Sequence, residues 1–357
     1  MKTVLGTKAV AAQEAIAALA ADVRDPAELL EEVRLRVERV VPNVGGGWML
    51  TDPRTVVPTS LVANGPHAEL SRRFFEHELT VPDVNGFAEL HRRGVAATSL
   101  GEATNGRPEL SPRYRELQAP SGLGDEARVL FRTGEATWAT TCVARAEDDA
   151  FFDEDELAWL RTIAPEVGRG LRRALGSRPC EPAPIWAPGM VVLDEAGNVE
   201  YTTGEADRWL AHMPGAGPLH LHATVLAVAM QARAETLAAA PAHAAPAQAR
   251  LRVDTGAWLY VHASALRDAS GAPVRTAVML EPADRAQLLP LLADVHGLTA
   301  RERDVVELLL AGLPVEDVAG RLQISRHTVR DHVKAVFAKL GVASRAEMTA
   351  RFLPELA

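Results

Sequence analysis

The stretch ISRHTVRDHVKAVFAKLGVASR, residues 324–345, decides how the end of this chain folds. Ser325 is a residue type that caps helices through its hydroxyl, and Gly341 is a residue type that ends them. Between these two residues an apolar stripe recurs at helical spacing: Val329, Val333, Val336, Phe337 and Leu340. A cationic row follows the opposite face: Arg326, Arg330 and Lys334. The pattern predicts an amphipathic helix whose exposed face is basic.

The neighbouring residues predict that 298–357 form an all-α bundle of four helices, with a helix-turn-helix inside it. Thr299 and Glu302 make a capping box that opens the first helix, and Gly312 ends it. Pro314 occupies the first helical position of a short second helix. The link to the third helix is brief, as a helix-turn-helix requires.

The third helix has the features of a recognition helix. Such a helix meets base edges in the major groove with its first turns, where Arg can read guanine and Asp can accept from cytosine. Helix starts can also offer backbone N–H groups to phosphates. Taken alone, the cationic row equally fits a solvated face. The expected DNA contacts are Thr299, Ser325, Arg326, His327, Thr328, Arg330, Asp331 and Lys334.

Two strings, LTARERDVVELLLAG (298–312) and VEDVAGRLQISRHTVRDHVKAVFAKLGVASR (315–345), resemble the LuxR-type C-terminal DNA-binding domain. The resemblance covers about a sixth of the chain and is specific. The matching residues are Leu298, Thr299, Arg301, Glu302, Gly312, Ala319, Leu322, Ile324, Ser325, Thr328, Val329, His332, Lys339, Leu340, Gly341, Val342 and Arg345.

The resemblance implies a sequence-specific transcription regulator that binds double-stranded DNA as a homodimer, on two half-sites about one helical turn apart or a multiple of that. RNA polymerase is a further partner that it suggests. The fourth helix would form the dimer contact through Met348 and Phe352, although both residues equally fit the bundle core. One departure is the segment 314–317, where Pro-Val-Glu-Asp replaces the usual Ser-Asn-Lys-Glu. A carboxylate there should weaken binding to the DNA backbone.

Composition limits what the rest of the chain can be. With 357 residues, 47% of them hydrophobic, the chain is long enough for two or three folded domains. Its formal net charge is −9, but from residue 298 onward nine Lys and Arg outnumber eight Asp and Glu. DNA contact must therefore come from a local patch. Two cysteines, Cys142 and Cys180, fit a reducing cytoplasm, and no segment is long and apolar enough for a membrane. We expect a cytoplasmic protein.

The residues before 298 predict an α+β region of antiparallel sheets with flanking helices. Its predicted helices are 8–23, 26–41, 151–175, 204–210 and 283–296, and its predicted strands include 46–50, 55–62, 127–133, 136–146 and 274–282. A Pro-rich segment marks the clearest boundary. The expected divisions are a first domain (1–176), a linker (177–188), a second domain (189–283), a connecting helix (284–297) and the DNA-binding domain (298–357).

The order of elements in the first domain resembles a GAF domain, and that in the second resembles a PAS domain. Both resemblances imply a sensory region, because such modules bind small molecules or serve as dimer platforms. A small-molecule effector is therefore an option, and the sequence does not identify it. Residues that could line a pocket in the first domain, or belong to its core instead, are Trp48, Phe74, Phe75, Phe87 and Trp138.

Other chemistry finds little support in the sequence. His220 and His222 would share one face of a strand but have no third ligand, so no metal site is expected. Cys142 lies in an apolar strand and is interpreted as a small buried hydrophobe. With no catalytic arrangement of Ser, His, Asp or Cys, an enzyme is not expected. Two other interpretations remain: a sigma-factor-like promoter subunit, and a ligand sensor whose helical tail is a docking module.

Overall fold

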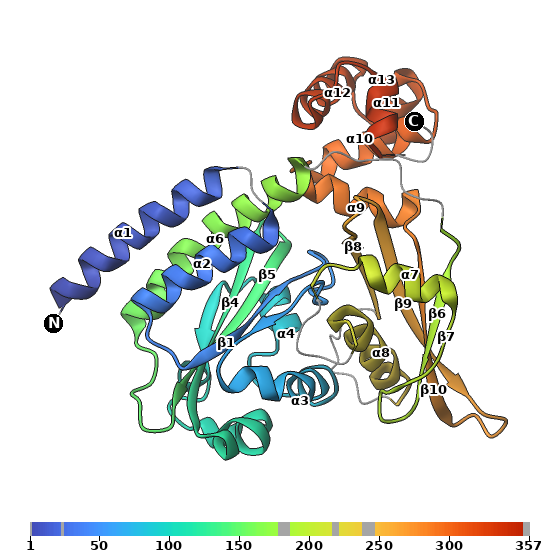
Figure 1. Ribbon diagram of the computed structural model, residues 1–357. Helices are drawn as coiled ribbons and strands as arrows, with labels where there is room; N and C mark the ends of the chain where they lie inside the picture. Colours follow the sequence, from blue (N-terminus) through green and yellow to red (C-terminus); the bar gives the residue numbers. More distant parts are fainter. Residues whose placement is uncertain (1, 23–24, 178–185, 216–220, 238–246, 353–357) are drawn as a thin grey trace.

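Two antiparallel sheets and a C-terminal group of helices make up the chain (Figure 1). We call them the first module (residues 2–177), the second module (186–282) and the C-terminal bundle (298–352). The computed structural model describes residues 2–22, 25–177, 186–215, 221–237 and 247–352. Several features of the sequence lie wholly or mainly outside these residues: the linker 177–188, Cys180 and His220. None of the described helices is long and apolar enough to cross a membrane.

The first module is built on a five-stranded sheet in the order β2-β1-β5-β4-β3, with every neighbouring pair antiparallel. The two predicted strands 127–133 and 136–146 are confirmed, and they form a hairpin around Gly134 at the centre of this sheet. The predicted strand 55–62 is wrong, because only a two-residue strand and one isolated bridge form there. The strands are β1 (Gly45–Leu50), β2 (Val62–Ala63), β3 (Ala97–Ser99), β4 (Leu123–Thr133) and β5 (Ala136–Ala146).

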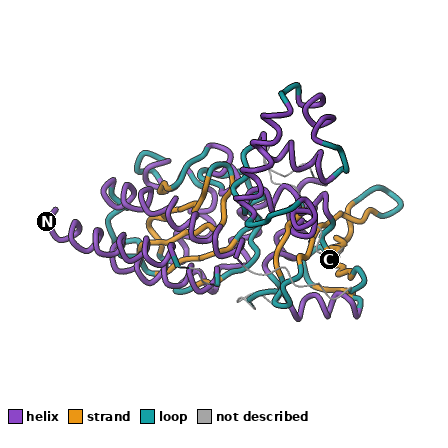
Figure 2. Tube along the Cα trace, turned by 90° about the horizontal axis from the view of Figure 1, so that it is seen from above, coloured by secondary structure: helices purple, strands orange, loops and turns teal. Residues whose placement is uncertain are grey.

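Helices cover both faces of this sheet: α1, α2 and α6 lie on one face, and α3 and α4 on the other (Figure 1). Helix α1 packs against α2 and α6, and Figure 2, a view from above, shows its N-terminal end projecting beyond them. The helices are α1 (Lys2–Ala21), α2 (Pro26–Val40), α3 (Pro66–Thr80), α4 (Phe87–Arg93), α5 (Leu100–Ala103) and α6 (Glu154–Ser177). Three short turns follow α5: η1 (Pro108–Leu110), η2 (Tyr114–Gln118) and η3 (Ala119–Ser121).

The long helix α6 is fixed at its start and in its middle. Asp153 Oδ1 accepts from the N–H of Glu156 at 2.9 Å, and Glu156 Oε2 accepts from the N–H of Asp153 at 3.0 Å, so the two residues form a capping box. Gly168 then lets the helix approach β4, since a Cβ at this position would lie 2.7 Å from the carbonyl oxygen of Arg132. The helix is therefore held directly against the sheet.

The second module has a five-stranded antiparallel sheet in the order β7-β6-β10-β9-β8. Its strands are β6 (Gly189–Leu193), β7 (Val199–Thr202), β8 (Gln248–Arg252), β9 (Trp258–Arg267) and β10 (Pro273–Pro282). The helices α7 (Gly204–His212) and α8 (Ala223–Thr236) pack against it. The second module also contacts the first, because α8 packs against α3 and the Thr224 hydroxyl donates to the carbonyl of Pro58 at 2.8 Å.

One buried ion pair joins the two modules. Asp52 lies in the turn after β1 and Arg250 in β8, and both are buried. The carboxylate of Asp52 accepts from Arg250 Nε at 2.7 Å, Arg250 Nη2 at 3.0 Å and the Arg250 N–H at 2.8 Å. A buried pair of this kind requires a defined geometry, so it fixes how the second sheet sits against the first module.

The connecting helix α9 (Arg285–Val295) lies between the modules and the C-terminal bundle, and contacts α6, α10 and α13 (Figure 1). Its leucines belong to the same apolar cluster as α2, α6 and the bundle. Asp294 at its end accepts from Arg54 of the first module at 3.0 Å and from Arg303 of the bundle at 2.9 Å. The bundle is therefore docked on the first module, with α9 between them.

The C-terminal bundle contains the four predicted helices: α10 (Ala300–Leu310), α11 (Val315–Leu322), α12 (Arg326–Leu340) and α13 (Arg345–Phe352). The capping box of Thr299 and Glu302 is confirmed. Pro314 differs from the prediction by one position, since it is the N-cap of α11 and has extended backbone dihedrals. The α+β region and the all-α C-terminal domain are thus both as predicted from the sequence.

Candidate nucleic-acid interface

Helix α12 is held in the bundle by one apolar side and by caps at both ends. Val329, Val336 and Leu340 are buried, and α12 contacts both α10 and α11. The Ser325 hydroxyl accepts from the N–H of Thr328 at 3.0 Å, and Gly341 ends the helix in the left-handed conformation. These contacts fix which side of α12 faces outward.

The outward side carries the predicted cations. Arg326, Arg330 and Lys334 are all exposed. Arg326 has a distant ion pair, with its Nη1 3.8 Å from Glu316 Oε1. Arg330 and Lys334 have no hydrogen bond or ion pair with any residue that the structure describes. Both side chains are therefore free to meet a phosphate or a base.

Three further predicted contacts lie on the first turns of α12. His327 and Asp331 are exposed, and His327 Nε2 lies 3.8 Å from Asp331 Oδ2. Thr328 is half-buried, and its hydroxyl shares a hydrogen bond of 2.9 Å with that of Ser325. The pair of His327 and Asp331 reduces the local positive charge at the start of the helix. It also places an acceptor where a cytosine amino group could donate.

Thr299 is not brought together with the other predicted residues. Its N–H donates to Glu302 Oε2 at 2.7 Å, and the same oxygen accepts from Lys339 at 2.6 Å. Lys339 belongs to the last turn of α12, so Thr299 lies roughly 20 Å along that helix from Ser325, at 1.5 Å per residue. Burial acts to raise the pKa of Glu302, but the hydrogen bonds from Lys339 and Thr299 lower it below its usual value. A phosphate at Thr299 would meet this carboxylate.

The predicted dimer contact on α13 is wrong for these two side chains. Met348 is 0% exposed and Phe352 is 1% exposed, and both belong to the core shared by the bundle, α9 and the first module. Neither can reach a second chain without leaving that core. The alternative, that they complete the bundle core, describes the structure.

The five aromatic residues predicted to line a pocket lie on two faces of the first sheet. Trp48 and Trp138 face α2 and α6, where Trp48 stacks on Phe131 with ring centroids 6.1 Å apart. Phe74, Phe75 and Phe87 belong to the cluster on the opposite face. A bulge in β5 determines the face of the sheet on which Trp138 lies. Ala139 pairs with Phe131 and Thr137 with Arg132, so Trp138 is the extra residue of the bulge. The five side chains therefore share no pocket.

A different group of side chains does converge in the first module. His67 of α3, Glu126 of β4 and Cys142 of β5 are buried and lie together, although 75 residues of sequence separate the first from the last. A small cavity of about 10 Å³ is lined by His67, Cys142, Phe74 and Phe75 among others. No local spacing in the sequence links these three residues, so the cluster could not be predicted from the sequence.

Comparison with known proteins supports the assignment of the C-terminal bundle. The family model for bacterial regulatory proteins, luxR family, matches residues 296–352. The chain is similar to a putative HTH-type transcriptional regulator of Aeromonas salmonicida, with 48% identity over 67 residues, which are 18% of this chain and 34% of that protein. The chain thus spans about a third of that relative.

The spore germination protein GerE of Bacillus subtilis is 41% identical over 56 residues, which are 16% of this chain and 76% of that protein. Among solved structures, a GAF domain/HD domain protein from Geobacter sulfurreducens aligns over 41% of this chain and 92% of its own. Its identity of 16% and TM-score of 0.31 are too low to support an argument about the first module. Because most of GerE is matched at 41% identity, the chain belongs to the luxR family of bacterial regulatory proteins.

Proposed function

We propose that this chain is a sequence-specific DNA-binding transcription regulator, in which α12 enters the major groove. The observation that carries the proposal is the outward side of α12, where Arg330 and Lys334 are exposed and paired with no described residue. The apolar side of the same helix is buried, so the cations are presented in a fixed orientation. This is the arrangement by which a helix-turn-helix reads a duplex.

Charge outside the bundle makes this surface selective. The whole chain has a formal net charge of −9, whereas the residues from 298 onward carry nine Lys and Arg against eight Asp and Glu. The net negative charge of the modules therefore repels a polyanion, whereas the patch on α12 attracts it. Few phosphate contacts are available, so we expect a modest salt dependence of binding and a large share of the affinity from base contacts.

The test is selection of DNA fragments by the full-length protein, followed by binding measurements on the selected site. Arg330→Ala should weaken specific binding about 5- to 100-fold, which corresponds to about 1–3 kcal/mol for one base contact. Lys334→Ala should weaken binding on all sequences and reduce the salt slope by about one. Arg267→Ala is the matched control, because Arg267 is an exposed cation at the far end of β9. Equal losses in all three variants would contradict the proposal.

We further propose the division of the chain into a first domain (1–176), a second domain (189–283) and a DNA-binding domain (298–357), with the first two acting as GAF-like and PAS-like sensory modules. The protein would act as a homodimer on two half-sites. Enrichment of one unpaired half-site by the full-length protein would contradict the dimer. A contact with RNA polymerase would provide activation, and transcription from the selected site with purified polymerase tests it.

Control of DNA binding would run through α9. Asp294 joins Arg54 of the first module to Arg303 of the bundle. A change in the first module would therefore alter the position of the bundle, and with it the position of α12. An effector can shift DNA affinity only by its different affinity for two arrangements. Arg54→Ala tests this route, since loss of the contact should change the affinity of the full-length protein for its site. Unchanged affinity, with unchanged hydrogen exchange in α10, would exclude it.

A further inference from the structure

Three buried side chains with the chemistry of metal ligands converge in the first module. They come from three elements: His67 from α3, Glu126 from β4 and Cys142 from β5. One ligand atom from each, a ring nitrogen, a carboxylate oxygen and the thiol sulfur, all lie within 4.8 Å of one another. His67 is 5% exposed, and Glu126 and Cys142 are each 1% exposed. The group is therefore shut off from solvent.

His67 and Cys142 have few partners outside this group of three side chains. His67 Nδ1 is buried and has no hydrogen bond with any residue that the structure describes. Cys142 Sγ lies 4.0 Å from the carbonyl oxygen of Gly47 and also interacts with the imidazole of His67. A buried polar atom without a partner costs about 1–3 kcal/mol, so a native core rarely keeps one. The adjoining cavity of about 10 Å³ has room for roughly one atom of the size of water.

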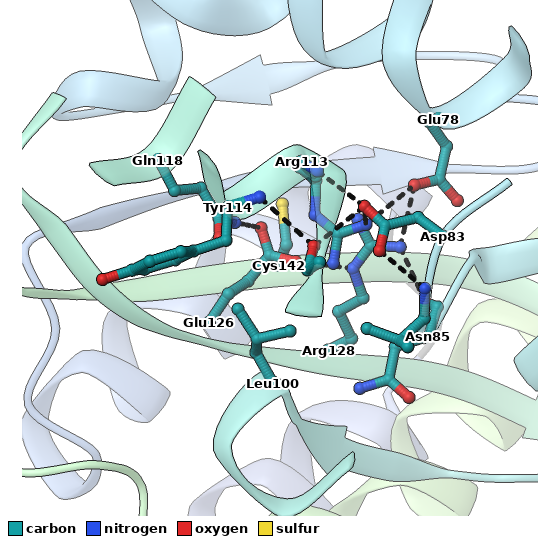
Figure 3. A network of polar contacts seen from close by, with 12 residues as sticks. Glu78, Asp83, Asn85, Leu100, Arg113, Tyr114, Gln118, Glu126, Arg128 and Cys142 are labelled. Atoms are coloured by element: carbon teal, nitrogen blue, oxygen red, sulfur yellow. Dashed lines mark hydrogen bonds and ion pairs between the residues drawn. The ribbon is translucent and has the colours of Figure 1, made fainter. Parts of the chain in front are cut away.

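The carboxylate of Glu126 is positioned by its neighbours. Oε1 accepts from Arg128 Nε at 2.6 Å and lies 3.3 Å from Arg113 Nη2 (Figure 3). Oε2 accepts from Gln118 at 2.6 Å. A carboxylate offers about four acceptor sites, and the imidazole of His67 is a further hydrogen-bonding partner of Glu126. Hydrogen bonds of this kind orient the carboxylate ligands of metal sites.

The network around Glu126 has one more carboxylate than it has guanidinium groups. Its fixed charges are three carboxylates, Glu78, Asp83 and Glu126, and two guanidinium groups, Arg113 and Arg128 (Figure 3). The balance is one negative charge, inside a part of the protein that disfavours uncompensated charge. A dication together with a Cys142 thiolate and a neutral His67 would bring the total to zero.

We propose that His67, Glu126 and Cys142 bind one transition-metal dication. Imidazole and thiolate select late first-row ions, and Zn²⁺ with three protein ligands keeps a fourth position, which here would face the small cavity. Binding forms a metal–sulfur bond and breaks the S–H bond of Cys142, and the proton leaves to solvent. This proposal concerns the first module and does not depend on DNA binding by α12.

The test uses Co²⁺ as a spectroscopic probe of the full-length protein, after treatment with a chelator and a reductant. One equivalent of Co²⁺ should give a sulfur-to-cobalt charge-transfer band, and Zn²⁺ should remove that band by displacement. Cys142→Ser and His67→Gln should abolish the band. Cys180→Ser is the matched control and should keep it, because Cys180 is the only other cysteine of the chain.

A positioning role for Gln118 gives a second measurement. Gln118→Ala should keep the band but weaken metal affinity about 10–100-fold, as loss of a partner that orients a ligand does. Circular dichroism and selection of the same DNA half-site show that each variant is folded. If neither the wild-type protein nor any variant selects a half-site, that result contradicts the regulator proposal and leaves the metal-site proposal untouched. Folded wild-type protein without the band would overturn the metal site. So would an unchanged band in Cys142→Ser.

Discussion

Replacing Arg250 with methionine should loosen the joint between the two modules. Methionine keeps the apolar stem and removes two charge-assisted hydrogen bonds, from Nε and Nη2 to Asp52. Asp52 is 0% exposed and would keep only backbone donors, the N–H groups of Arg54 at 3.0 Å, Thr55 at 3.3 Å and residue 250. Breaking a buried pair costs about 3–5 kcal/mol, and the remaining donors place this case near the lower end.

Equilibrium unfolding in urea, followed by circular dichroism and by tryptophan fluorescence, measures this cost. Asp52→Asn combined with Arg250→Met should lose less than the two single variants together, with a coupling of about 1–3 kcal/mol, because no unpaired charge is left buried. Arg92→Met is the control, since Arg92 pairs with Glu89 at the surface and should cost less than about 1 kcal/mol. A cost for Arg250→Met no larger than that of Arg92→Met would refute the reasoning.

Three further predictions concern the junction and the bundle. Burial, with Arg351 and Arg172 nearby, lowers the pKa of His296 to about 4. The contribution of neutral His296 to stability is therefore complete above pH 6.5 and falls by up to about 3 kcal/mol as the pH drops to about 4. In His296→Leu, the free energy of unfolding in urea should change less with pH over this range. Phe352→Ala should cost about 3–5 kcal/mol in urea unfolding, with the oligomeric state in sedimentation unchanged. Ser325→Ala should cost about 1 kcal/mol in the same assay through loss of the cap to Thr328, and Ser325→Thr much less.

Each of these predictions has a result that would contradict it. For His296, it is an unchanged dependence of unfolding on pH in the leucine variant between pH 6.5 and 4. For Phe352, it is a shift from dimer to monomer in protein that is still folded, which would restore the dimer contact on α13. For Ser325, it is equal stability of the alanine and threonine variants, which would show that the hydroxyl is not a cap.

The C-terminal bundle could be predicted in detail because its signals are local. Thr299 with Glu302 and Ser325 with Gly341 mark helix ends within a few residues, and the stripe between them sets which side is buried. The same holds for the capping box at Asp153 and for the hairpin around Gly134. In each of these cases the residues that decide the structure are neighbours in the sequence.

Features that depend on distant residues could not be predicted in this way. The side to which Trp138 points depends on a bulge opposite Arg132, which no spacing within β5 reveals. In the sequence Cys142 stands in an apolar strand and is interpreted as a small buried hydrophobe. Only the fold shows that His67 of α3 lies beside it. Phe352 has the spacing of a surface contact and of a core residue alike, and only the position of α9 decides between them.

Helix α6 also has a mechanical consequence. Near its start, Arg161 donates to the carbonyl of Ala97 in β3, and at its other end Gly176 lies against Val295 of α9. Its 24 residues span about 36 Å at 1.5 Å per residue. A tilt of about 5° about the contact of Gly168 with β4 would move Gly176, about 12 Å further along the helix, by roughly 1 Å. Helix α6 is thus a rigid connection between the first sheet and α9, and a small rotation at the sheet would displace the helix that carries the bundle.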